Sequence, residues 1–297
     1  MIYLQIKGGL GNQLFQYSVG YFLKKQFNTE LCLDFSSAAA GRLLKKAKIK
    51  KNYSFRDIQL ECFSLDIHRS QSSVTRFVVD QVIQKVSKTR GFTGNSIAPV
   101  IKEDGTDCRQ NNIGALNAAG RSKNVIVTGY WQNINYINPI REDLVRQFRI
   151  TLDTGTEYNE FLKQIHTSIS VGVHVRRGDF VALGWDKGAD YYRNAMMVAR
   201  QMLPDAKFYF FSDDQEWVKN NLYEKKDSIQ VEIHEDHPDV KEFDLLRHCQ
   251  HQIISESTFG WWAAYLNENC DKQIFIPFDC RGDIWLDEWN RVEYSKN

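Results

Sequence analysis

Residues 171–180 read V-G-V-H-V-R-R-G-D-F, a β-branched run that turns abruptly into two arginines, a glycine and an aspartate. The run predicts a buried strand whose alternation turns His174 and Arg176 to the same face. In open α/β sheets, ligands bind where strands end, and two guanidinium groups there suit a diphosphate, which arginine grips bidentately. The alternative is structural: Arg177 and Asp179 form an ion pair, and His174 is a core histidine with satisfied hydrogen bonds.

The second half of the chain alternates between strand and helix patterns. Apolar runs predict strands at residues 169–175, 208–212, 228–233, 252–255 and 273–277. Helical patterns lie between several of them, at residues 191–202, 216–222, 242–249 and 259–267. Strands that alternate with helices indicate a parallel sheet, so this half is predicted to be an α/β domain.

The first 34 residues begin with the same alternation. Residues 2–6 predict a strand, which is followed by a glycine-rich turn, a helix and a second strand at 31–34. Gly9 and Gly11 nearly match the dinucleotide-binding pattern, and Asp34 lies about where a ribose-binding acid is found. This spacing leaves a nicotinamide cofactor open as an alternative.

The chain is long enough for two domains. At 297 residues it exceeds what one hydrophobic core usually fills. A strand at 125–128 and a helix that Pro139 opens close the first half, and the polar stretch 151–158 predicts the boundary. The sequence therefore predicts an N-terminal domain of residues 1–152 and a C-terminal domain of residues 153–297.

Composition indicates a globular protein whose partner is small or neutral. Hydrophobic residues make up 42% of the chain and charged residues 25%, as in soluble proteins. The formal net charge of +1 argues against a nucleic-acid partner, which usually requires a basic excess. The six cysteines are widely separated and form no C-x-x-C pair, so neither a zinc site nor a disulfide scaffold is predicted.

The start of the chain favours a cytoplasmic protein. Met1 is followed at once by the first strand, which leaves no room for a signal peptide, and no apolar run approaches the ~20 residues of a membrane span. A basic run without acids begins at Arg42 and ends at Arg56. Such a run is either a solvated face or a patch that contacts anionic lipid at the inner face of the membrane.

Two aromatic residues and an amide follow the strand predicted at 125–128. They are Tyr130, Trp131 and Gln132. An aromatic pair with an amide at the end of a strand suits a sugar ring. Core packing of Trp131 is the alternative, because clustered aromatic residues more often fill a core.

Acidic residues follow the strand predicted at 208–212. Asp213 and Asp214 can accept hydrogen bonds from a nucleotide base, or they can cap the helix that follows. Residues 234–239 read H-E-D-H-P-D and contain metal-ligand residue types. Their proline and the lack of a helical frame favour a solvated loop, so no metal site is predicted there.

A hydroxyl-rich turn follows the strand predicted at 252–255. Ser255, Ser257 and Thr258 precede a helix, so their hydroxyls and the first helix amides can cradle a phosphate. Ordinary N-capping of the helix is the alternative. Glu256 would repel a diphosphate at this turn unless its side chain is turned away.

Five of these stretches together resemble the alpha-1,2-fucosyltransferase family, glycosyltransferase family 11, in its bacterial branch. The matching segments are G-G-L-G-N-Q-L-F-Q-Y (8–17), G-Y-W-Q (129–132), H-V-R-R-G-D (174–179), F-S-D-D (211–214) and I-I-S-E-S-T-F-G-W-W-A-A-Y-L (253–266). The last segment departs from the family pattern at Glu256 and Gly260, where the family has asparagine and serine. Five motifs in the expected order are more specific than any one of them.

The resemblance implies two Rossmann-like α/β domains facing a cleft, the GT-B type of glycosyltransferase. The acceptor side is the N-terminal domain, and the C-terminal domain binds GDP-fucose. The implied reaction is an inverting transfer of L-fucose from GDP-fucose to the 2-hydroxyl of a terminal galactose, in a surface glycan of the O-antigen kind or its precursor. It implies neither a cofactor nor a metal.

The resemblance also implies roles for single residues. The expected catalytic residues are Arg176, Asn12 and Asp179. Asp179 is the acid nearest the motif and a possible base for the acceptor hydroxyl; Asp186 and Asp190 follow it, and the sequence does not choose among the three. The expected donor-binding residues are His174, Arg176, Arg177, Asp213, Asp214, Ser255, Ser257, Thr258, Phe259 and Gly11. The expected acceptor-binding residues are Tyr130, Trp131 and Gln132.

Three alternatives stand beside this reading. A protein fucosyltransferase, or one that forms another linkage, shares the motif at residues 174–179. A nicotinamide-dependent oxidoreductase of nucleotide sugars is suggested by Gly9, Gly11 and Asp34. A glycan-binding protein without catalysis is suggested by the aromatic residues.

Overall fold

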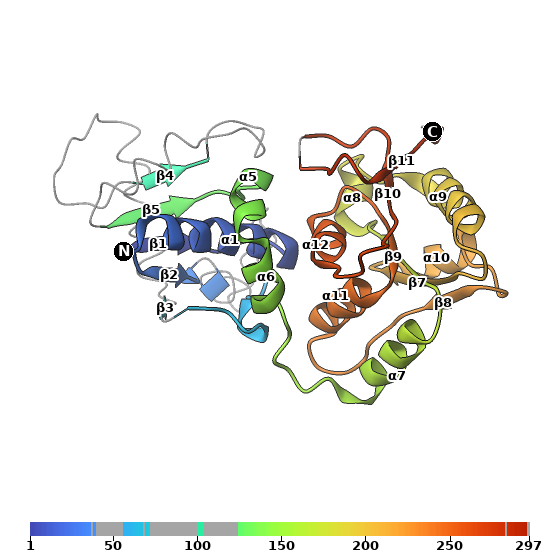
Figure 1. The fold of residues 1–297 in the computed structure, drawn as a ribbon, viewed down its shortest axis with the longest axis horizontal. Coiled ribbons are helices and arrows are strands. Elements are labelled where there is room, and N and C mark those ends of the chain that lie inside the picture. Colours follow the sequence, from blue (N-terminus) through green and yellow to red (C-terminus); the bar gives the residue numbers. More distant parts are fainter. Residues whose placement is uncertain are drawn as a thin grey trace. The chain divides into compact units, whose positions relative to one another are not determined.

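The structure is a computed structural model that describes residues 1–36, 38–39, 56–67, 69–71, 100–103, 124–282 and 284–295. Contacts divide the chain into two compact units, Met1–Phe148 and Arg149–Asn297 (Figure 1). The boundary between the units falls after Phe148, whereas the sequence predicted a domain boundary after residue 152. Nearly all of the basic run from Arg42 to Arg56 lies outside the described residues.

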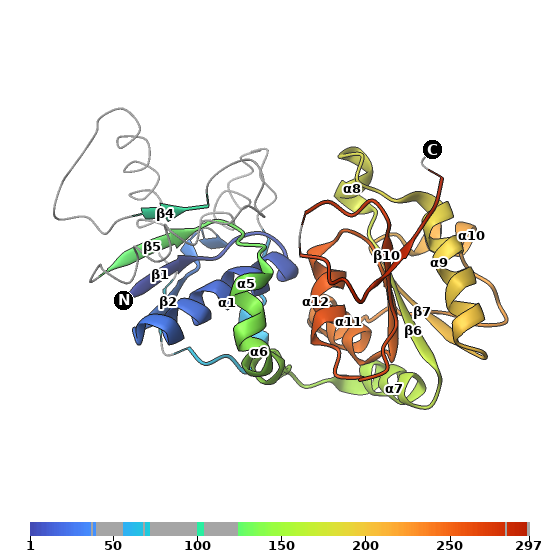
Figure 2. The same ribbon diagram turned by 45° about the horizontal axis from the view of Figure 1, so that its top comes forward.

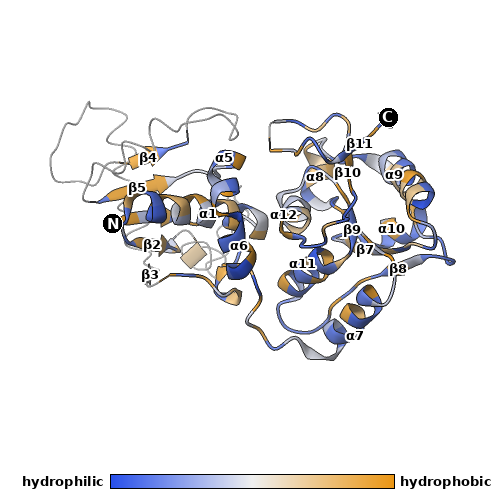
Figure 3. Cartoon of the chain, viewed as in Figure 1, coloured by the Kyte–Doolittle hydropathy of each residue, from blue (hydrophilic) through white to orange (hydrophobic). Residues whose placement is uncertain are grey.

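The first unit contains a parallel sheet of five strands in the order β3-β2-β1-β5-β4. Every paired neighbour runs in the same direction. In Figure 3, β5 is largely hydrophobic in colour, which agrees with the burial of all four of its residues. The strands are β1 (Ile2–Gln5), β2 (Leu31–Asp34), β3 (Arg69–Gln71), β4 (Val100–Lys102) and β5 (Val125–Thr128).

One long helix, α1 (Leu10–Phe27), connects β1 to β2. It packs closely on the sheet because it carries Gly20 where a Cβ atom would lie 2.6 Å from the side chain of Leu4. The other helices in the described part of this unit are short: η1 (Leu60–Cys62), α5 (Ile134–Ile137), η2 (Asn138–Ile140) and α6 (Arg141–Gln147).

The helix predicted to start at Pro139 is found to within about two residues, but its first turn is of a different type. Pro139 lies in the first turn of η2, a 3-10 turn, and α6 begins only at Arg141. Proline is tolerated in either kind of first turn because the amide it lacks would have no partner there. Pro139 therefore indicated where a helix begins, but not whether its first turn is a 3-10 turn or an α-helical turn.

The second unit contains a parallel sheet of six strands in the order β11-β10-β9-β6-β7-β8. All of its paired neighbours are parallel. Five of the strands were predicted from the sequence to within a few residues, and β11 was not predicted. The strands are β6 (Ser170–Val175), β7 (Lys207–Ser212), β8 (Ser228–Gln230), β9 (His251–Ile254), β10 (Ile274–Pro277) and β11 (Asn290–Val292).

Helices cover both faces of this second sheet. In Figures 1 and 2, α11 and α12 lie on one face, and α9 and α10 lie on the other. These four helices were predicted, whereas α7 and α8 were not. The helices are α7 (Gly155–His166), α8 (Gly178–Ala182), α9 (Gly188–Met202), α10 (Gln215–Asn221), α11 (Pro238–His248) and α12 (Thr258–Leu266).

The core of the second unit is built around β6, whose six residues are all buried. Val171, Val173 and Val175 pack with β7 and α9 on one side of the sheet. On the other side, a Cβ atom at Gly172 would lie 2.5 Å from the side chain of Leu246, so α11 approaches the strand closely. The predicted alternation of the strand at residues 171–175 is confirmed.

Each unit is thus a Rossmann-like α/β unit with a parallel sheet, as the sequence predicted. Because the strands of one sheet run in the same direction, all their carboxyl ends lie at one edge. The loops that leave this edge in the second unit contain most of the predicted donor-binding residues. Among the helices of the described residues, none is both long enough and apolar enough to cross a bilayer.

Candidate active site

The strand register brings three predicted loops of the second unit together. His174 in β6 pairs with Ile254 in β9, and Val175 in β6 pairs with Ser212 in β7. The chain therefore leaves β6, β7 and β9 at the same level of the sheet. The arginines, the paired aspartates and the hydroxyl-rich turn follow these three strands directly.

Arg176 is held between two carboxylates. Its guanidinium lies 2.5 Å from an oxygen of Asp179 and 2.8 Å from an oxygen of Asp213, and it lies near the ring of Phe180. One quarter of the Arg176 side chain is exposed. The charge of Arg176 is thus balanced within the site while the guanidinium still reaches solvent.

Arg177 connects three segments. Its guanidinium lies 2.7 Å from Asp186 and 3.1 Å from Asp214, and it lies over the ring of Trp217 at 4.1 Å. The ion pair with Asp179, expected as the structural alternative for Arg177, is made by Arg176 instead. Arg177 therefore holds the loop after β6 against the start of α10.

Asp213 and Asp214 have different partners. Asp213 accepts a hydrogen bond from the amide of Arg177 at 2.9 Å and pairs with Arg176. Asp214 is the N-cap of α10 and accepts a hydrogen bond from the amide of Trp217 at 3.1 Å. The helix-cap alternative is therefore confirmed for Asp214. Asp213 holds the loop after β6 through its contacts with Arg176 and Arg177.

His174 lies inside the protein. Its ring is 6% exposed and stacks on Phe259, with ring centres 5.0 Å apart. Burial, helped by the positive charge of Arg176, lowers the pKa of His174 to about 3, so the ring is neutral at neutral pH. Its Nδ1 atom has no hydrogen-bond partner among the described residues. The structural alternative is therefore correct in placing His174 in the core, but wrong in expecting its hydrogen bonds to be satisfied.

The turn before α12 combines capping with buried hydroxyls. Ser257 is the N-cap and accepts a hydrogen bond from the amide of Phe259 at 3.4 Å. Ser255 is only 1% exposed, whereas Thr258 and Phe259 are partly exposed. The sequence expectation that Ser255 offers a hydroxyl to a ligand is not supported by this burial. Thr258 and Phe259 form the accessible part of the turn.

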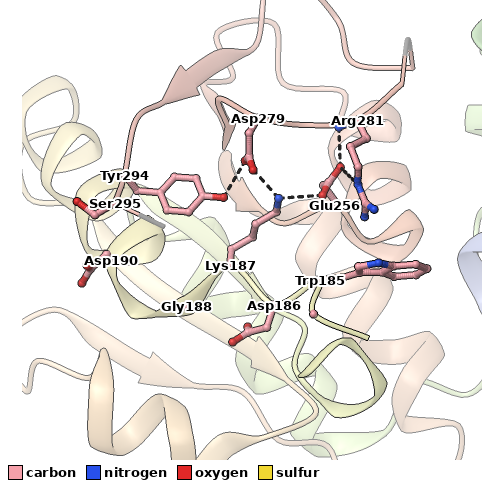
Figure 4. Close-up of a pocket in the computed structure, with 11 residues that line it drawn as sticks. Trp185, Asp186, Lys187, Gly188, Asp190, Glu256, Asp279, Arg281, Tyr294 and Ser295 are labelled. Carbon is pink, nitrogen blue, oxygen red and sulfur yellow. Dashed lines mark hydrogen bonds and ion pairs between the residues drawn. The ribbon is translucent and has the colours of Figure 1, made fainter. Parts of the chain in front are cut away.

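Glu256 is turned away from the helix terminus. Its carboxylate lies 2.8 Å from the ammonium group of Lys187 and accepts a hydrogen bond from the amide of Arg281 at 2.6 Å (Figure 4). Burial acts to raise the pKa of Glu256, but the hydrogen bonds from Lys187 and Arg281 outweigh it, and the pKa lies below its usual value. This acid is therefore ionised, paired and no obstacle to an anion at α12.

In the first unit, two predicted site residues contact each other. The amide of Gln132 donates a hydrogen bond to the side-chain oxygen of Asn12 at 3.0 Å. Gly11 is buried beside Asn12 in the first turn of α1. The expected catalytic asparagine and the expected acceptor-binding glutamine thus form one polar group between α1 and the end of β5.

The two aromatic residues after β5 differ in exposure. Trp131 is 2% exposed and packs edge-on against Tyr136, with ring centres 6.4 Å apart. Its ring is not accessible to a sugar, so the core-packing alternative is the correct one. Tyr130 is partly exposed, and the ammonium group of Lys7 lies 5.0 Å from the centre of its ring.

The other candidate sites have structural partners. Asp34 is 3% exposed and accepts a hydrogen bond from the amide of Ser36 at 2.9 Å, so it is not presented to a ribose. Within the described ranges, no three His, Cys, Asp or Glu side chains are gathered in a way that could hold a metal ion. The segment at residues 234–239 is not wholly a loop, because Pro238 and Asp239 begin α11.

Sequence reasoning missed the group that surrounds Glu256. Lys187, Asp279 and Arg281 lie in loops without a motif, and they come from two segments about 90 residues apart. The one signal was the departure from the family pattern at position 256, since a buried acid requires a cationic partner. Nothing in the sequence indicated which lysine or arginine would supply it.

Comparison with known proteins identifies the relatives of this chain. The family model described as Glycosyl transferase family 11 matches residues 1–292. An alpha-1,2-colitosyltransferase of Escherichia coli is 26% identical over 290 residues, covering 93% of this chain and 90% of that protein. The O-antigen biosynthesis glycosyltransferase WbnK of Escherichia coli is 25% identical and covers 93% of both chains.

A mammalian relative matches over a shorter length. The galactoside 2-alpha-L-fucosyltransferase SEC1 of Bos taurus is 30% identical over 156 residues, which cover 48% of this chain and 42% of that protein. The family assignment over nearly the whole chain does not depend on this partial match.

Two solved structures share the fold. The fucosyltransferase NodZ from Bradyrhizobium has a TM-score of 0.51 at 13% identity and covers 88% of this chain and 91% of its own. A mutant of Arabidopsis thaliana FUT1 in complex with GDP has a TM-score of 0.53 at 13% identity and covers 93% of this chain and 70% of its own. The fold predicted from the sequence is thereby confirmed as that of known fucosyltransferases.

Proposed function

The chain belongs to glycosyl transferase family 11, and from that premise we propose that it transfers L-fucose from GDP-fucose to the 2-hydroxyl of a terminal galactose. The acceptor is a surface glycan of the O-antigen kind or its precursor. Two relatives support this proposal, because one is named as an O-antigen glycosyltransferase and another as a galactoside 2-alpha-L-fucosyltransferase.

One observation carries the donor assignment. Arg176 follows β6 and the N-terminus of α12 follows β9, and these two strands are paired neighbours in register. A guanidinium and free helix amides at one sheet edge suit a diphosphate. Because Glu256 is neutralised by Lys187, the turn before α12 keeps its attraction for an anion.

The mechanism follows from the charge that develops on departing GDP. The donor carries β-linked fucose and the product linkage is α, so the reaction is a single in-line displacement with inversion and an oxocarbenium-like transition state. Arg176 stabilises the diphosphate as the glycosidic bond breaks. In doing so it exchanges a carboxylate of Asp213 or Asp179 for phosphate oxygens, and its partial exposure supports that exchange.

The acceptor hydroxyl needs a group that takes its proton. Of the three candidate bases, Asp186 is bound to Arg177 and its side chain is 18% exposed. The side chain of Asp190 is 41% exposed, but it lies in α9 and pairs with Arg193. Asp179 lies beside Arg176 and its side chain is 55% exposed. Accessibility beside the reacting centre therefore favours Asp179 as the general base. Asn12 is proposed as a further catalytic residue, because it matches the family motif at residues 8–17.

The proposal includes no metal and no cofactor. The positive charges at the site come from the chain itself, and a neutral glycan acceptor agrees with the formal net charge of +1. A location in the cytoplasm, with contact to the inner face of the membrane through the run from Arg42 to Arg56, would place the enzyme beside a lipid-linked acceptor.

A GDP-release assay tests the proposal. Purified protein is mixed with GDP-fucose and a panel of galactose-terminated disaccharides, and the linkage of the product is read by NMR. GDP release with an α-1,2 linkage supports the proposal, and its absence with every acceptor overturns it. A GDP-linked colitosyl donor belongs in the same panel, because one relative is named as a colitosyltransferase. Increased NADH fluorescence would favour the oxidoreductase instead.

A further inference from the structure

A cavity of about 480 Å³ opens in the second unit beside the segment that connects α8 to α9. It is lined by residues 184–188 of that segment, by Asp190, and by residues from the segments after β9 and β10 and from the end of the chain (Figure 4). Its volume falls within the roughly 300–1,000 Å³ of small-molecule pockets. The predicted donor and acceptor residues do not line it.

A buried network of charged side chains forms one wall of this cavity. The side chain of Lys187 is 8% exposed, and its ammonium group lies 2.8 Å from Glu256 and 3.2 Å from Asp279. The hydroxyl of Tyr294 donates a hydrogen bond to Asp279 at 2.7 Å. Figure 4 shows this row of side chains from Tyr294 to Arg281. Buried charges that are mutually paired hold their wall in one arrangement.

The same network positions an exposed tryptophan. Glu256 accepts hydrogen bonds from the amide and the guanidinium of Arg281, at 2.6 and 3.3 Å. The guanidinium of Arg281 lies 5.0 Å from the ring centre of Trp185, and the ring of Phe180 meets Trp185 edge-on. Trp185 nevertheless remains 40% exposed. Its ring is therefore fixed by neighbours while part of it faces solvent.

The lining of the cavity selects the chemistry of its ligand. Four carboxylates and two cations line it, and Lys187 and Arg281 are already paired with Glu256 and Asp279, so the lining keeps an excess of negative charge that disfavours a phosphate group. The aromatic ring of Trp185 beside carboxylates suits a neutral ligand ring that carries hydroxyl groups. The apolar face of the ligand ring stacks on the tryptophan, and the ligand hydroxyls donate hydrogen bonds to the carboxylates. A saccharide has both properties.

We propose that this cavity binds a saccharide ring of the acceptor glycan, stacked on Trp185. The inference rests on the proposed transfer to a glycan, and it extends acceptor binding to the second unit. Asp186 lines the cavity and also pairs with Arg177. The bound ring would consequently lie next to the loop that holds Arg176.

Steady-state kinetics of Trp185→Ala provide the first test. Loss of the stacking platform is expected to raise KM for a galactose-terminated disaccharide about tenfold, with KM for GDP-fucose and Kd for GDP unchanged. Trp185→Phe should recover most of the loss because it keeps an aromatic face. Tyr223→Ala is the matched control, since Tyr223 is 39% exposed in the same unit and does not line the cavity.

Substitutions of Glu256 in the charged network provide a second, independent test. Glu256→Ala removes the partner of Arg281 and should raise KM for the acceptor as Trp185→Ala does, whereas Glu256→Gln can still accept from the Arg281 amide and should retain more affinity. If Trp185→Ala weakens GDP binding instead, the cavity binds the nucleotide and the inference fails. Unchanged kinetics in Trp185→Ala also overturn it.

Direct binding separates this inference from the proposed function. Saturation-transfer NMR with lactose and other galactose-terminated disaccharides needs no turnover. Binding by the wild type that is lost in Trp185→Ala supports the saccharide site, even if no donor is ever transferred and the proposed function fails. A wild type that binds none of the disaccharides, or a Trp185→Ala protein that binds them equally well, overturns the inference.

Discussion

The guanidinium of Arg176 lies 2.8 Å from a carboxylate oxygen of Asp213. This contact joins the loop after β6 to the loop after β7, and Asp213 also accepts a hydrogen bond from the amide of Arg177. Asp213 thereby holds the arginine at the sheet edge. A diphosphate that replaces the carboxylate would find the guanidinium already in place, which is the arrangement that electrostatic catalysis requires.

Arg176→Ala is expected to lower turnover of GDP-fucose by roughly 10²- to 10³-fold, because it removes a preorganised donor to the departing diphosphate. Arg176→Lys should recover only part of this loss, since an ammonium group lacks the bidentate fork. Initial rates of GDP release measure the effect. Arg200→Ala is the control, because Arg200 forms ion pairs with Glu224 and Asp227 elsewhere in the unit. An Arg176→Ala enzyme within a few-fold of wild type would contradict the role.

Removal of divalent metal should leave the activity unchanged. The charge on GDP is expected to be balanced by Arg176 and by the amides at the start of α12. Rates of transfer measured in excess EDTA, and again after addition of Mg²⁺ or Mn²⁺, should agree within error. A large loss in EDTA that either metal restores would show that the chain does not supply this charge alone.

Substitutions of Gly260 should reveal the space around His174. A Cβ atom at Gly260 would lie 2.8 Å from Nδ1 of His174, so Gly260→Ala should destabilise the second unit by about 1–3 kcal/mol. Gly260→Ser should be less destabilising than Gly260→Ala, because its hydroxyl can hydrogen-bond to the unpartnered Nδ1 atom at about 1 kcal/mol.

Urea unfolding of the two Gly260 variants measures this difference. Serine forms helices less readily than alanine, so helix propensity alone would make Gly260→Ser the less stable variant. A higher free energy of unfolding for Gly260→Ser must therefore come from the hydrogen bond. The related family carries serine at this position, in agreement with the expectation. A Gly260→Ser protein that is less stable than Gly260→Ala would refute it.

His174 should make the protein less stable in mild acid. Its pKa is about 3 in the folded state because of burial and Arg176, and 6.5 without those effects. Between these values the unfolded state binds more protons, so the free energy of unfolding falls as the pH drops below 6.5, by up to about 1.4 kcal/mol per pH unit. His174→Gln should flatten this dependence. Unfolding curves with equal pH slopes for both proteins would exclude it.

Glu242 should act in the opposite direction. Burial, with Asp239 and Glu232 nearby, raises its pKa to about 7, above the usual 4.5. The stability it contributes is present below pH 4.5 and is lost as the pH rises through 7. Glu242→Gln should therefore be more stable than wild type at pH 8, by about 1–3 kcal/mol, and equal to it near pH 4.5. Denaturant titrations at these two pH values test the sign.

The sequence alone was sufficient for the fold class and for the place of the site. The β-branched run at residues 171–175 and the alternation that follows it predict a parallel sheet, whose strand ends gather at one edge whatever the details of packing. The five motifs then identify the family, and their residues lie at strand ends or helix starts. Local pattern determines these features.

Only the tertiary structure decided the partners and the exposure of each side chain. Asp179 pairs with Arg176 and not with Arg177, Trp131 is buried while Trp185 is exposed, and Glu256 turns to Lys187. Each of these outcomes depends on segments that are distant in the sequence or on the direction in which a loop leaves its strand. Burial and ion pairing arise from packing between such segments, so the residues on either side of a given position do not determine them.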